Sequence, residues 1–219
     1  MFLTHMPLNP ERRSTRDLMQ SPQRLHAAVL AVFPPGSRET GRILWRLDHP
    51  ERHRLDLYLV SHMAPSLESM ADQAGWSTQP VWRTTDYGPF LRRLADGQRW
   101  VFRLRANPIR SVTRDVGKRG QRVALPRAAD QLAWLVHRGG KYGFEVVDGE
   151  NGPNVRVTEQ RTERFRRGGP ETKLVTLNTA AFEGVLEVTD AELLRNALSQ
   201  GVGSAKAYGC GLMTLAALP

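Results

Sequence analysis

Two hydrophobic repeats alternate along the first 90 residues, and their alternation restricts the fold more than any other feature. Leucines at every second position from Leu55 to Leu59 indicate a strand with one buried face. Apolar residues at i, i+3, i+4, i+7 and i+8 from Leu25 indicate an amphipathic helix. Ser21 is a favourable N-cap for this helix, Pro22 suits its first position, and the sequence PPG at 34–36 ends it.

The segments of residues 1–90 follow one another in the order strand, helix, strand, strand, helix, strand. The expected strands are 2–8, 42–49, 53–61 and 78–86, and the expected helices are 21–33 and 67–73. This is the β-α-β-β-α-β order of the ferredoxin-like fold. We therefore expect residues 1–90 to form one α+β domain with an antiparallel sheet.

Residues 97–219 show a similar order with less regular patterns. Strands are expected at 99–109, 144–147, 155–165, 174–182 and 208–215, and a helix at 128–139. The segments 155–165 and 174–182 flank the turn sequence GGPE and predict a basic hairpin. A last helix begins with a capping box of Thr189 and Glu192, and Gly201 ends it in a left-handed conformation. We expect these residues to form a second domain.

The net charge favours a polyanionic partner. The chain has 31 Lys and Arg against 22 Asp and Glu, a formal charge of +9, and a sequence pI of about 10.5. A basic enzyme that binds no nucleic acid would show the same balance, so charge alone leaves both classes open. The single cysteine, Cys210, excludes an internal disulfide and a multi-cysteine zinc site. Because no segment resembles a signal peptide or membrane span, we expect a cytoplasmic protein without a membrane partner.

Basic residues concentrate in two segments. Between residues 99 and 127 there are nine Lys or Arg and one acid, Asp115, whereas a solvated face usually mixes both signs. Such a cluster suits RNA or DNA phosphates, and arginines on the predicted hairpin could also reach base edges. The candidate RNA-binding residues are Arg103, Arg105, Arg110, Arg114, Lys118, Arg119 and Arg122 in the first segment, and Arg156, Arg161, Arg164 and Arg166 in the hairpin.

Residues 201–212, GVGSAKAYGCGL, form a glycine-rich stretch between the last helix and the last strand. Nucleotide-binding loops lie between a strand and the following helix, so this reversed order excludes the Rossmann and Walker interpretations. Two interpretations stay open: the glycines make only a tight turn, or the loop also holds a phosphodiester backbone. In the second, Gly203, Ser204 and Tyr208 contact RNA and Lys206 neutralises a phosphate.

One of the six histidines, His26, differs from the others in its position. It lies on the first predicted helix, beside the apolar stripe and next to Leu25. Taken alone, it is better explained as a boundary histidine whose ring packs over Leu30. The other histidines have no carboxylates at metal-ligand spacing, and we expect structural or surface roles for His49, His53, His62 and His137.

Five motifs, in order along the chain, resemble those of the CasE endoribonucleases of type I-E CRISPR systems. They are LNPERR after the first strand, SPQRLHAAVLAVFP on the first helix, FRLRANP followed by GKR, FEGVLEVTD before the last helix, and GVGSAKAYGCGLM at the end. The resemblance runs over most of the chain. Its most specific part is the helix motif together with RANP and GKR, because the glycine-rich loop occurs across related repeat-processing families.

This resemblance implies two tandem ferredoxin-like domains of the RRM type with antiparallel sheets. It also implies an endoribonuclease, independent of metals and other cofactors, that cleaves precursor CRISPR RNA at the base of the repeat stem-loop. The protein would stay bound to the 3′ hairpin as a Cascade subunit, next to a backbone subunit. Attack by the RNA's own 2′-hydroxyl would leave a 2′,3′-cyclic phosphate and a 5′-hydroxyl. His26 matches the catalytic histidine of the family and would accept or donate a proton, with the direction of transfer left open. Lys206 is the candidate cation for the phosphorane charge, or else it binds the RNA backbone away from the cut.

The sequence departs from the family within the candidate catalytic set. Members often carry a tyrosine three residues before the histidine, in the pattern D-P-Y-x-x-H, whereas this chain has Gln23 there and Ser21 in place of the acid. Glutamine does not titrate, although its amide can hydrogen-bond a phosphate or orient the 2′-hydroxyl. Tyr208, Ser37 and Arg38 are candidate replacements for the tyrosine. A non-catalytic RNA-binding subunit of the same fold therefore stays as the alternative function.

Overall fold

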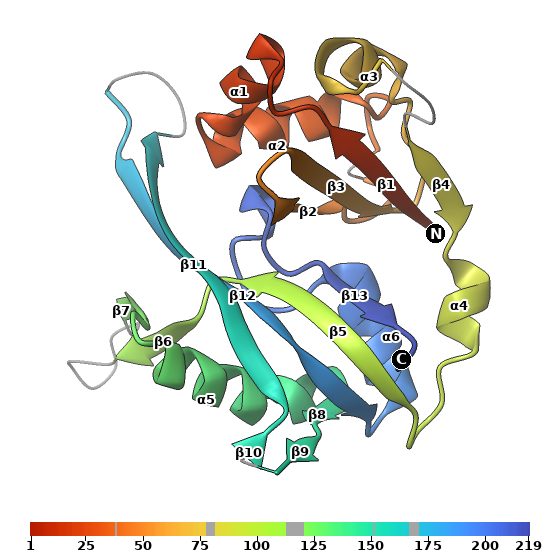
Figure 1. The fold of residues 1–219 in the computed structure, drawn as a ribbon, viewed down its shortest axis with the longest axis vertical. Helices are drawn as coiled ribbons and strands as arrows, with labels where there is room; N and C mark the ends of the chain where they lie inside the picture. The colour runs from red at the N-terminus through yellow and green to blue at the C-terminus, as the bar shows by residue number, and fades with distance from the viewer. Residues whose placement is uncertain (38, 78–81, 113–120, 151, 167–170) are drawn as a thin grey trace.

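Residues 2–86 contain a four-stranded antiparallel sheet in the order β2-β3-β1-β4 (Figure 1). The computed structural model describes residues 1–37, 39–77, 82–112, 121–150, 152–166 and 171–219. The strands are β1 (Phe2–Leu8), β2 (Leu44–Glu51), β3 (Arg54–Ser61) and β4 (Arg83–Asp86). The beginning of the expected last strand, 78–81, lies outside the described residues. Numbered within this half, the order is 4-1-3-2, the ferredoxin-like arrangement predicted from the sequence.

Three helices cover one face of this sheet (Figure 1). They are α1 (Arg13–Met19), α2 (Pro22–Ala31) and α3 (Glu68–Ala74). Leu25 and Val29 of α2 pack with Met6 of β1 and Leu57 of β3 in one buried cluster. The apolar stripe read from the sequence is therefore the face that α2 buries against the sheet.

Helix α2 begins where the sequence predicts. Ser21 Oγ accepts the N–H of Arg24 at 3.2 Å, and Pro22 is the first helical residue. Helix α1 was not predicted, because its sequence is polar and has no apolar stripe. It is held by tertiary contacts instead: Thr15 is buried and its hydroxyl donates to the carbonyl of Ala74, at the end of α3, at 3.3 Å.

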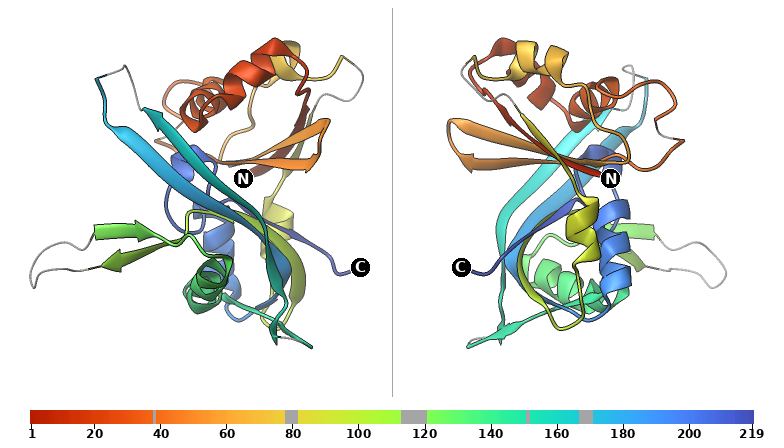
Figure 2. Two further views of the ribbon diagram at one scale, coloured as in Figure 1. Left: turned by 60° about the vertical axis from the view of Figure 1, so that its left-hand side comes forward. Right: turned by 90° about the vertical axis from the view of Figure 1, so that its right-hand side faces the viewer.

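The second half repeats the topology of the first. Its main sheet has the order β11-β12-β5-β13, with β8 also pairing with β12, and each of these pairs is antiparallel. Read from β13, this is again 4-1-3-2, so the chain has two tandem ferredoxin-like halves. Helices α5 and α6 pack on one face of this sheet (Figures 1 and 2). The elements are β5 (Arg99–Ala106), α5 (Ala128–Gly139), β8 (Phe144–Val146), β11 (Val155–Arg166), β12 (Leu174–Val188), α6 (Ala191–Gln200) and β13 (Met213–Ala216).

Smaller elements join and extend the two halves. Helix α4 (Gly88–Arg92) connects them, and strands β6 (Ile109–Val112) and β7 (Gln121–Ala124) form a hairpin that projects from the second half (Figure 2). The others are η1 (Gly140–Tyr142), β9 (Asp148–Gly149), β10 (Gly152–Pro153) and η2 (Lys206–Tyr208). The strand expected at 99–109 is interrupted, since Pro108 has no N–H to donate to a sheet. Among the described helices, none has the length and apolar character needed to cross a membrane.

The cap predicted for the last helix was wrong by one residue. Helix α6 is capped by Asp190, whose carboxylate accepts the N–H groups of Glu192 and Leu193, each at 2.9 Å. Thr189 lies in the bend between β12 and this cap, and the N–H groups of Thr189 and Asp190 both donate to the carbonyl of Gly143, at 3.0 and 3.2 Å.

Two expectations for the glycine-rich end were also wrong in detail. Gly201 has a φ of 82° and a ψ of 152°, so its φ is positive but the residue is not in the left-handed helical region. The last strand begins at Met213 and not at Tyr208, because residues 206–208 form the tight turn η2. The loop between α6 and β13 is therefore longer than the sequence suggested.

A buried arginine joins the two halves. Arg46 of the edge strand β2 is 2% exposed, and its guanidinium pairs with Asp48 through two contacts of 2.8 and 2.9 Å. It also donates to the carbonyls of Arg103 at 2.8 Å and Leu212 at 3.1 Å, and to the hydroxyl of Thr214 at 2.9 Å. These acceptors lie on or beside β5 and β13, so Arg46 holds the first sheet against the second.

Candidate active site at the junction of the two halves

His26 lies on α2 at the junction and is half-buried. Its Nδ1 accepts a hydrogen bond from the indole Nε1 of Trp45 on β2, with 3.4 Å between the two nitrogens. Its ring also lies edge-on to the ring of Tyr208, with centroids 6.4 Å apart and an interplanar angle of 64°. The helix that carries His26 therefore contacts the glycine-rich loop, although the two are far apart in sequence.

His26 and Lys206 line the same cavity, which has a volume of about 430 Å³. Arg42, just before β2, and Gln200, at the end of α6, line it as well. The structure thus brings together two of the three residues that sequence analysis proposed for catalysis, a histidine and a cation, whereas Gln23 is not among the residues that line this cavity. Within the described part of the chain, no three His, Cys, Asp or Glu side chains gather as a metal site would require.

The surroundings of Lys206 in this cavity lower the pKa of its side chain. Partial burial lowers the pKa of its ammonium group, and the nearby guanidinium of Arg42 lowers it further. Both effects make the ammonium group a better proton donor than an exposed lysine. A cation in this position also suits the negative charge that a phosphorane develops.

The glycines of residues 201–212 meet conformational and steric requirements of the loop. Gly203, Gly209 and Gly211 have φ values of 77°, 75° and 92°. The N–H of Gly203 donates to the hydroxyl of Tyr142 at 2.9 Å, and the N–H of Gly211 donates to the carbonyl of Arg105 at 2.7 Å. Ser204 is in contact with Asn107, whose amide donates to its hydroxyl at 3.4 Å. These observations favour the turn interpretation, and contact of Gly203 or Ser204 with RNA stays a prediction.

Gln23, which stands where the family often has a tyrosine, and the described candidate replacements for that tyrosine, Tyr208 and Ser37, have different surroundings. Gln23 is half-buried one turn before His26 on the same helix, so the two lie on one side of α2. Tyr208 is the candidate that approaches His26, and its ring also packs edge-on to Phe165 with centroids 4.8 Å apart. Ser37 donates to the carbonyl of Pro34 at 2.5 Å, and position 38 lies outside the described residues.

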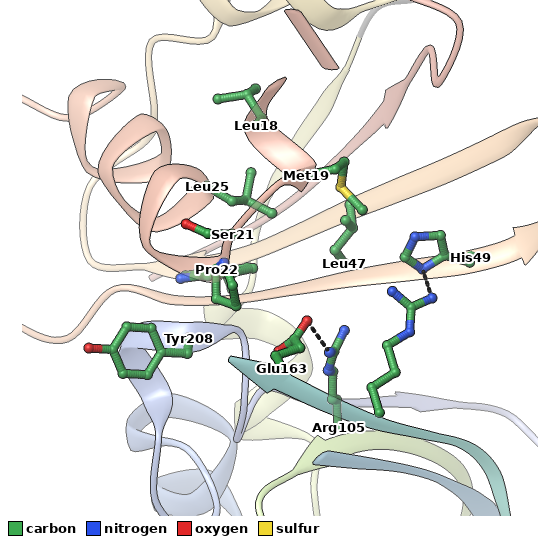
Figure 3. A pocket seen from close by; sticks show the side chains of 12 residues that line it. Leu18, Met19, Ser21, Pro22, Leu25, Leu47, His49, Arg105, Glu163 and Tyr208 are labelled. Carbon is green, nitrogen blue, oxygen red and sulfur yellow. Dashed lines mark hydrogen bonds and ion pairs between the residues drawn. The ribbon is translucent and has the colours of Figure 1, made fainter. Parts of the chain in front are cut away.

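A second pocket at the junction contains charged residues that pair within the chain (Figure 3). Arg105 contacts Glu163 at 3.3 Å and donates to the hydroxyl of Thr179 at 3.2 Å. Arg161 pairs with Glu159 and lies 3.2 Å from Nδ1 of His49. Burial lowers the pKa of His49, and the charge of Arg161 lowers it further. Arg105 and Arg161 thus face the first half, with carboxylates beside them.

The other predicted RNA-binding residues divide into paired and exposed ones. Arg103 contacts Glu183 at 2.7 Å and Asp48 at 3.4 Å, and Arg156 contacts Glu183 at 3.1 Å. Exposed on the surface are Arg110, Arg122, Arg164 and Arg166, and Arg156 is exposed as well as paired, with 76% of its side chain accessible. Arg114, Lys118 and Arg119 lie outside the described residues. The predicted basic hairpin therefore does not present one continuous basic face, because burial along β11 alternates from residue to residue.

Two residues of the site were missed by sequence reasoning. Trp45 has the pattern of an ordinary buried strand residue, and Arg42 precedes the same strand with no motif around it. Both are recognised only when α2, β2 and the 201–212 loop are placed together. No local sequence signal marks either residue as part of a site.

The comparisons with known proteins cover the whole fold just described. A sequence model of the family described as CRISPR associated protein matches residues 1–217, and the chain belongs to this family. The CRISPR-associated endoribonuclease Cse3 of Thermus thermophilus is 33% identical, over 99% of this chain and 100% of the relative. The CRISPR system Cascade subunit CasE of Escherichia coli is 37% identical over 53% of this chain and 57% of its own length. The structure of Thermus thermophilus Cse3 bound to an RNA representing a pre-cleavage complex aligns with a TM-score of 0.81 and 31% identity, over 99% of this chain and 98% of that one.

Proposed function

We propose that this chain is an endoribonuclease that cleaves precursor CRISPR RNA at the base of the repeat stem-loop, without a metal, and stays bound to the 3′ hairpin of the product. The observation that carries the proposal is the shared cavity of His26 and Lys206 in a chain whose 33% identical relative is an endoribonuclease. In the cytoplasm, the RNA-bound protein would be a subunit of Cascade beside a backbone subunit.

The reaction is a transesterification within the RNA. The 2′-oxygen forms a bond to phosphorus while the bond from phosphorus to the 5′-oxygen breaks, the 2′-hydroxyl loses its proton, and the 5′-oxygen gains one. We assign His26 to a direct contact with the reacting groups and Lys206 to the phosphorane charge. Gln23, one turn from His26, would orient the phosphate or the 2′-hydroxyl through its amide.

RNA binding would involve both halves of the chain. We propose that residues 1–90 form the domain carrying His26 and residues 97–219 the domain carrying most RNA contacts. The exposed arginines, Arg110, Arg122, Arg164 and Arg166, are the best supported phosphate contacts because solvent reaches them. Contacts by Arg103, Arg105, Arg156 and Arg161 would require exchange of a carboxylate partner for phosphate. Arg114, Lys118 and Arg119, between β6 and β7, complete the proposed set together with Gly203, Ser204 and Tyr208 of the loop.

The proposal is tested with the purified chain and a repeat hairpin RNA in EDTA. We expect cleavage to a 2′,3′-cyclic phosphate and a 5′-hydroxyl, and no cleavage of a substrate with a 2′-deoxy sugar at the cut site. His26→Ala should abolish cleavage while the hairpin still binds, and the exposed His53→Ala is the matched control that should cleave normally. Binding of the RNA without cleavage under any condition would favour the non-catalytic alternative.

A further inference from the structure

Trp45 makes the contact that decides which nitrogen of His26 carries a proton. Its side chain is buried, with 3% of the residue exposed, and its Nε1 lies 3.4 Å from Nδ1 of His26. An indole nitrogen can donate a hydrogen bond but cannot accept one. Nδ1 of His26 must therefore offer its lone pair, and the proton of the neutral ring must be on Nε2.

The glycine-rich loop holds the indole in this position. A Cβ atom added at Gly209 would lie 2.6 Å from Cζ3 of Trp45, a distance that no side chain could occupy. The loop can close on the indole only because position 209 has no side chain and a φ of 75°. Gly209 thus acts on His26 through Trp45.

The hydrogen bond from Trp45 requires a His26 ring without a proton on Nδ1. A proton added to Nδ1 would face the Trp45 N–H, so this contact is lost when Nδ1 is protonated. Among the described residues that line the same cavity, Lys206 from η2 and Arg42 from the segment before β2 carry charge, and both are cations. Tyr208 also packs against the ring, edge-on.

We propose that Trp45 is a positioning residue that holds His26 as the neutral imidazole with its proton on Nε2. His26 then presents an N–H donor to an oxygen of the scissile phosphate and does not act as the base for the 2′-hydroxyl. The proton stays on the ring: solvent water takes the proton of the 2′-hydroxyl, and the ammonium group of Lys206, which then regains a proton from water, protonates the 5′-oxygen. This inference rests on the proposed function only where it names a phosphate oxygen as the acceptor of the His26 N–H. The position of the proton on the His26 ring is a property of the protein without RNA.

The first test reads the ring directly, without RNA. Two-bond 1H–15N spectra of the full chain labelled with [15N]histidine, assigned with His26→Gln, should show a pyridine-type Nδ1 and a pyrrole-type Nε2. Trp45→Phe should raise the pKa of His26, since the opposing donor is gone. Trp82→Phe, the same substitution in a tryptophan packed against the same core cluster, should leave the spectrum of His26 unchanged. A pyrrole-type Nδ1, or no change in Trp45→Phe, would overturn the proposal even if the chain cleaves RNA.

The second test separates positioning from binding. In single-turnover cleavage, Trp45→Phe should lower the rate about five- to tenfold, the value of one hydrogen bond, with the dissociation constant for RNA unchanged. If loss of ring volume prevents folding, benzothienylalanine at position 45 keeps the shape of the indole and replaces only the N–H by sulfur. A benzothienylalanine variant that cleaves at the wild-type rate with an unaltered His26 spectrum would contradict the role of Trp45. Absence of cleavage in the wild type would instead contradict the proposed function.

Discussion

Replacement of Arg46 by methionine should destabilise the protein more than any surface substitution. Arg46 is 2% exposed, and its loss would leave the buried carboxylate of Asp48 with the Nε of Arg103, 3.4 Å away, as its one ionic partner among the described residues. The carbonyls of Arg103 and Leu212 would lose their hydrogen bonds from Arg46 as well. Methionine fills similar apolar space but donates no hydrogen bond, so the substitution isolates the polar contacts.

The expected magnitude follows from the burial of the pair. Removing one partner of a buried ion pair costs about 3–5 kcal/mol, because an uncompensated charge remains out of water. The nearby Arg103 offsets part of this cost, so we expect the free energy of unfolding to fall by about 3 kcal/mol. For a chain of this length each kcal/mol corresponds to about 2–4 °C, so the melting temperature should fall by about 6–12 °C.

Arg54 provides a matched control on the neighbouring strand. It pairs with Asp56 at 3.0 Å with the same spacing in sequence, but its side chain is 50% exposed. Arg54→Met should therefore cost less than about 1 kcal/mol. Urea unfolding followed by both tryptophan fluorescence and circular dichroism measures the two variants and checks that the transition is two-state. If Arg46→Met and Arg54→Met lose equal stability, the reasoning about the junction is refuted.

Three further outcomes are expected. Stability should fall as the pH drops below about 6.5, because the pKa of His49 is lowered in the folded state and the unfolded chain binds the proton first. In His49→Gln, the urea midpoint of unfolding should depend less on pH below about 6.5. An unchanged pH dependence would contradict the assignment of this loss of stability to His49. Arg164→Gln should weaken binding of the hairpin RNA and reduce the slope of log binding constant against log salt concentration by about one. Arg161→Gln should leave this slope unchanged, because Arg161 is paired with a carboxylate. Equal slopes for the two variants would contradict the separation of paired from RNA-binding arginines. Gly209→Ala should lower the free energy of unfolding by about 2 kcal/mol more than Gly36→Ala. Both glycines have a positive φ, but of these two positions only at 209 would the new Cβ lie 2.6 Å from an indole carbon. Equal losses of stability in urea unfolding would show that this close contact has no effect.

Local patterns were sufficient for most elements of the fold. The Leu55–Leu59 alternation and the stripe beginning at Leu25 predicted β3 and α2, because each element buries one face whose period is visible in the sequence. Helix α1 escaped this reasoning because it is held by contacts such as that of Thr15 with the end of α3. The cap of α6 is Asp190 and not Thr189, because both are good capping residues and the sequence does not show which of two neighbours takes the position.

The candidate site was only partly accessible from the sequence. His26 and Lys206 were identified through motif resemblance, and the structure places both at one cavity. The contacts of Trp45, Arg46 and Arg42 could not be predicted, since each depends on how two sheets meet and no periodic pattern encodes that. A residue that acts across a junction carries in its own sequence neighbourhood only the signature of the strand to which it belongs.

The alternation along β11 separates the arginines that stabilise the fold from those available to RNA. Arg161 faces the junction beside Glu159, whereas Gln160, one residue away, points to the opposite face and donates to the carbonyl of Pro126 just after β7. Every second residue of β11 counted from Gln160, including the exposed Arg164, therefore lies on the same face of the sheet, next to the segment that follows the β6–β7 hairpin. Arg164 is therefore open to solvent, and hence to phosphate, whereas Arg161 is paired with Glu159. Affinity for RNA and stability of the junction should accordingly respond to different substitutions, even between neighbouring residues of one strand.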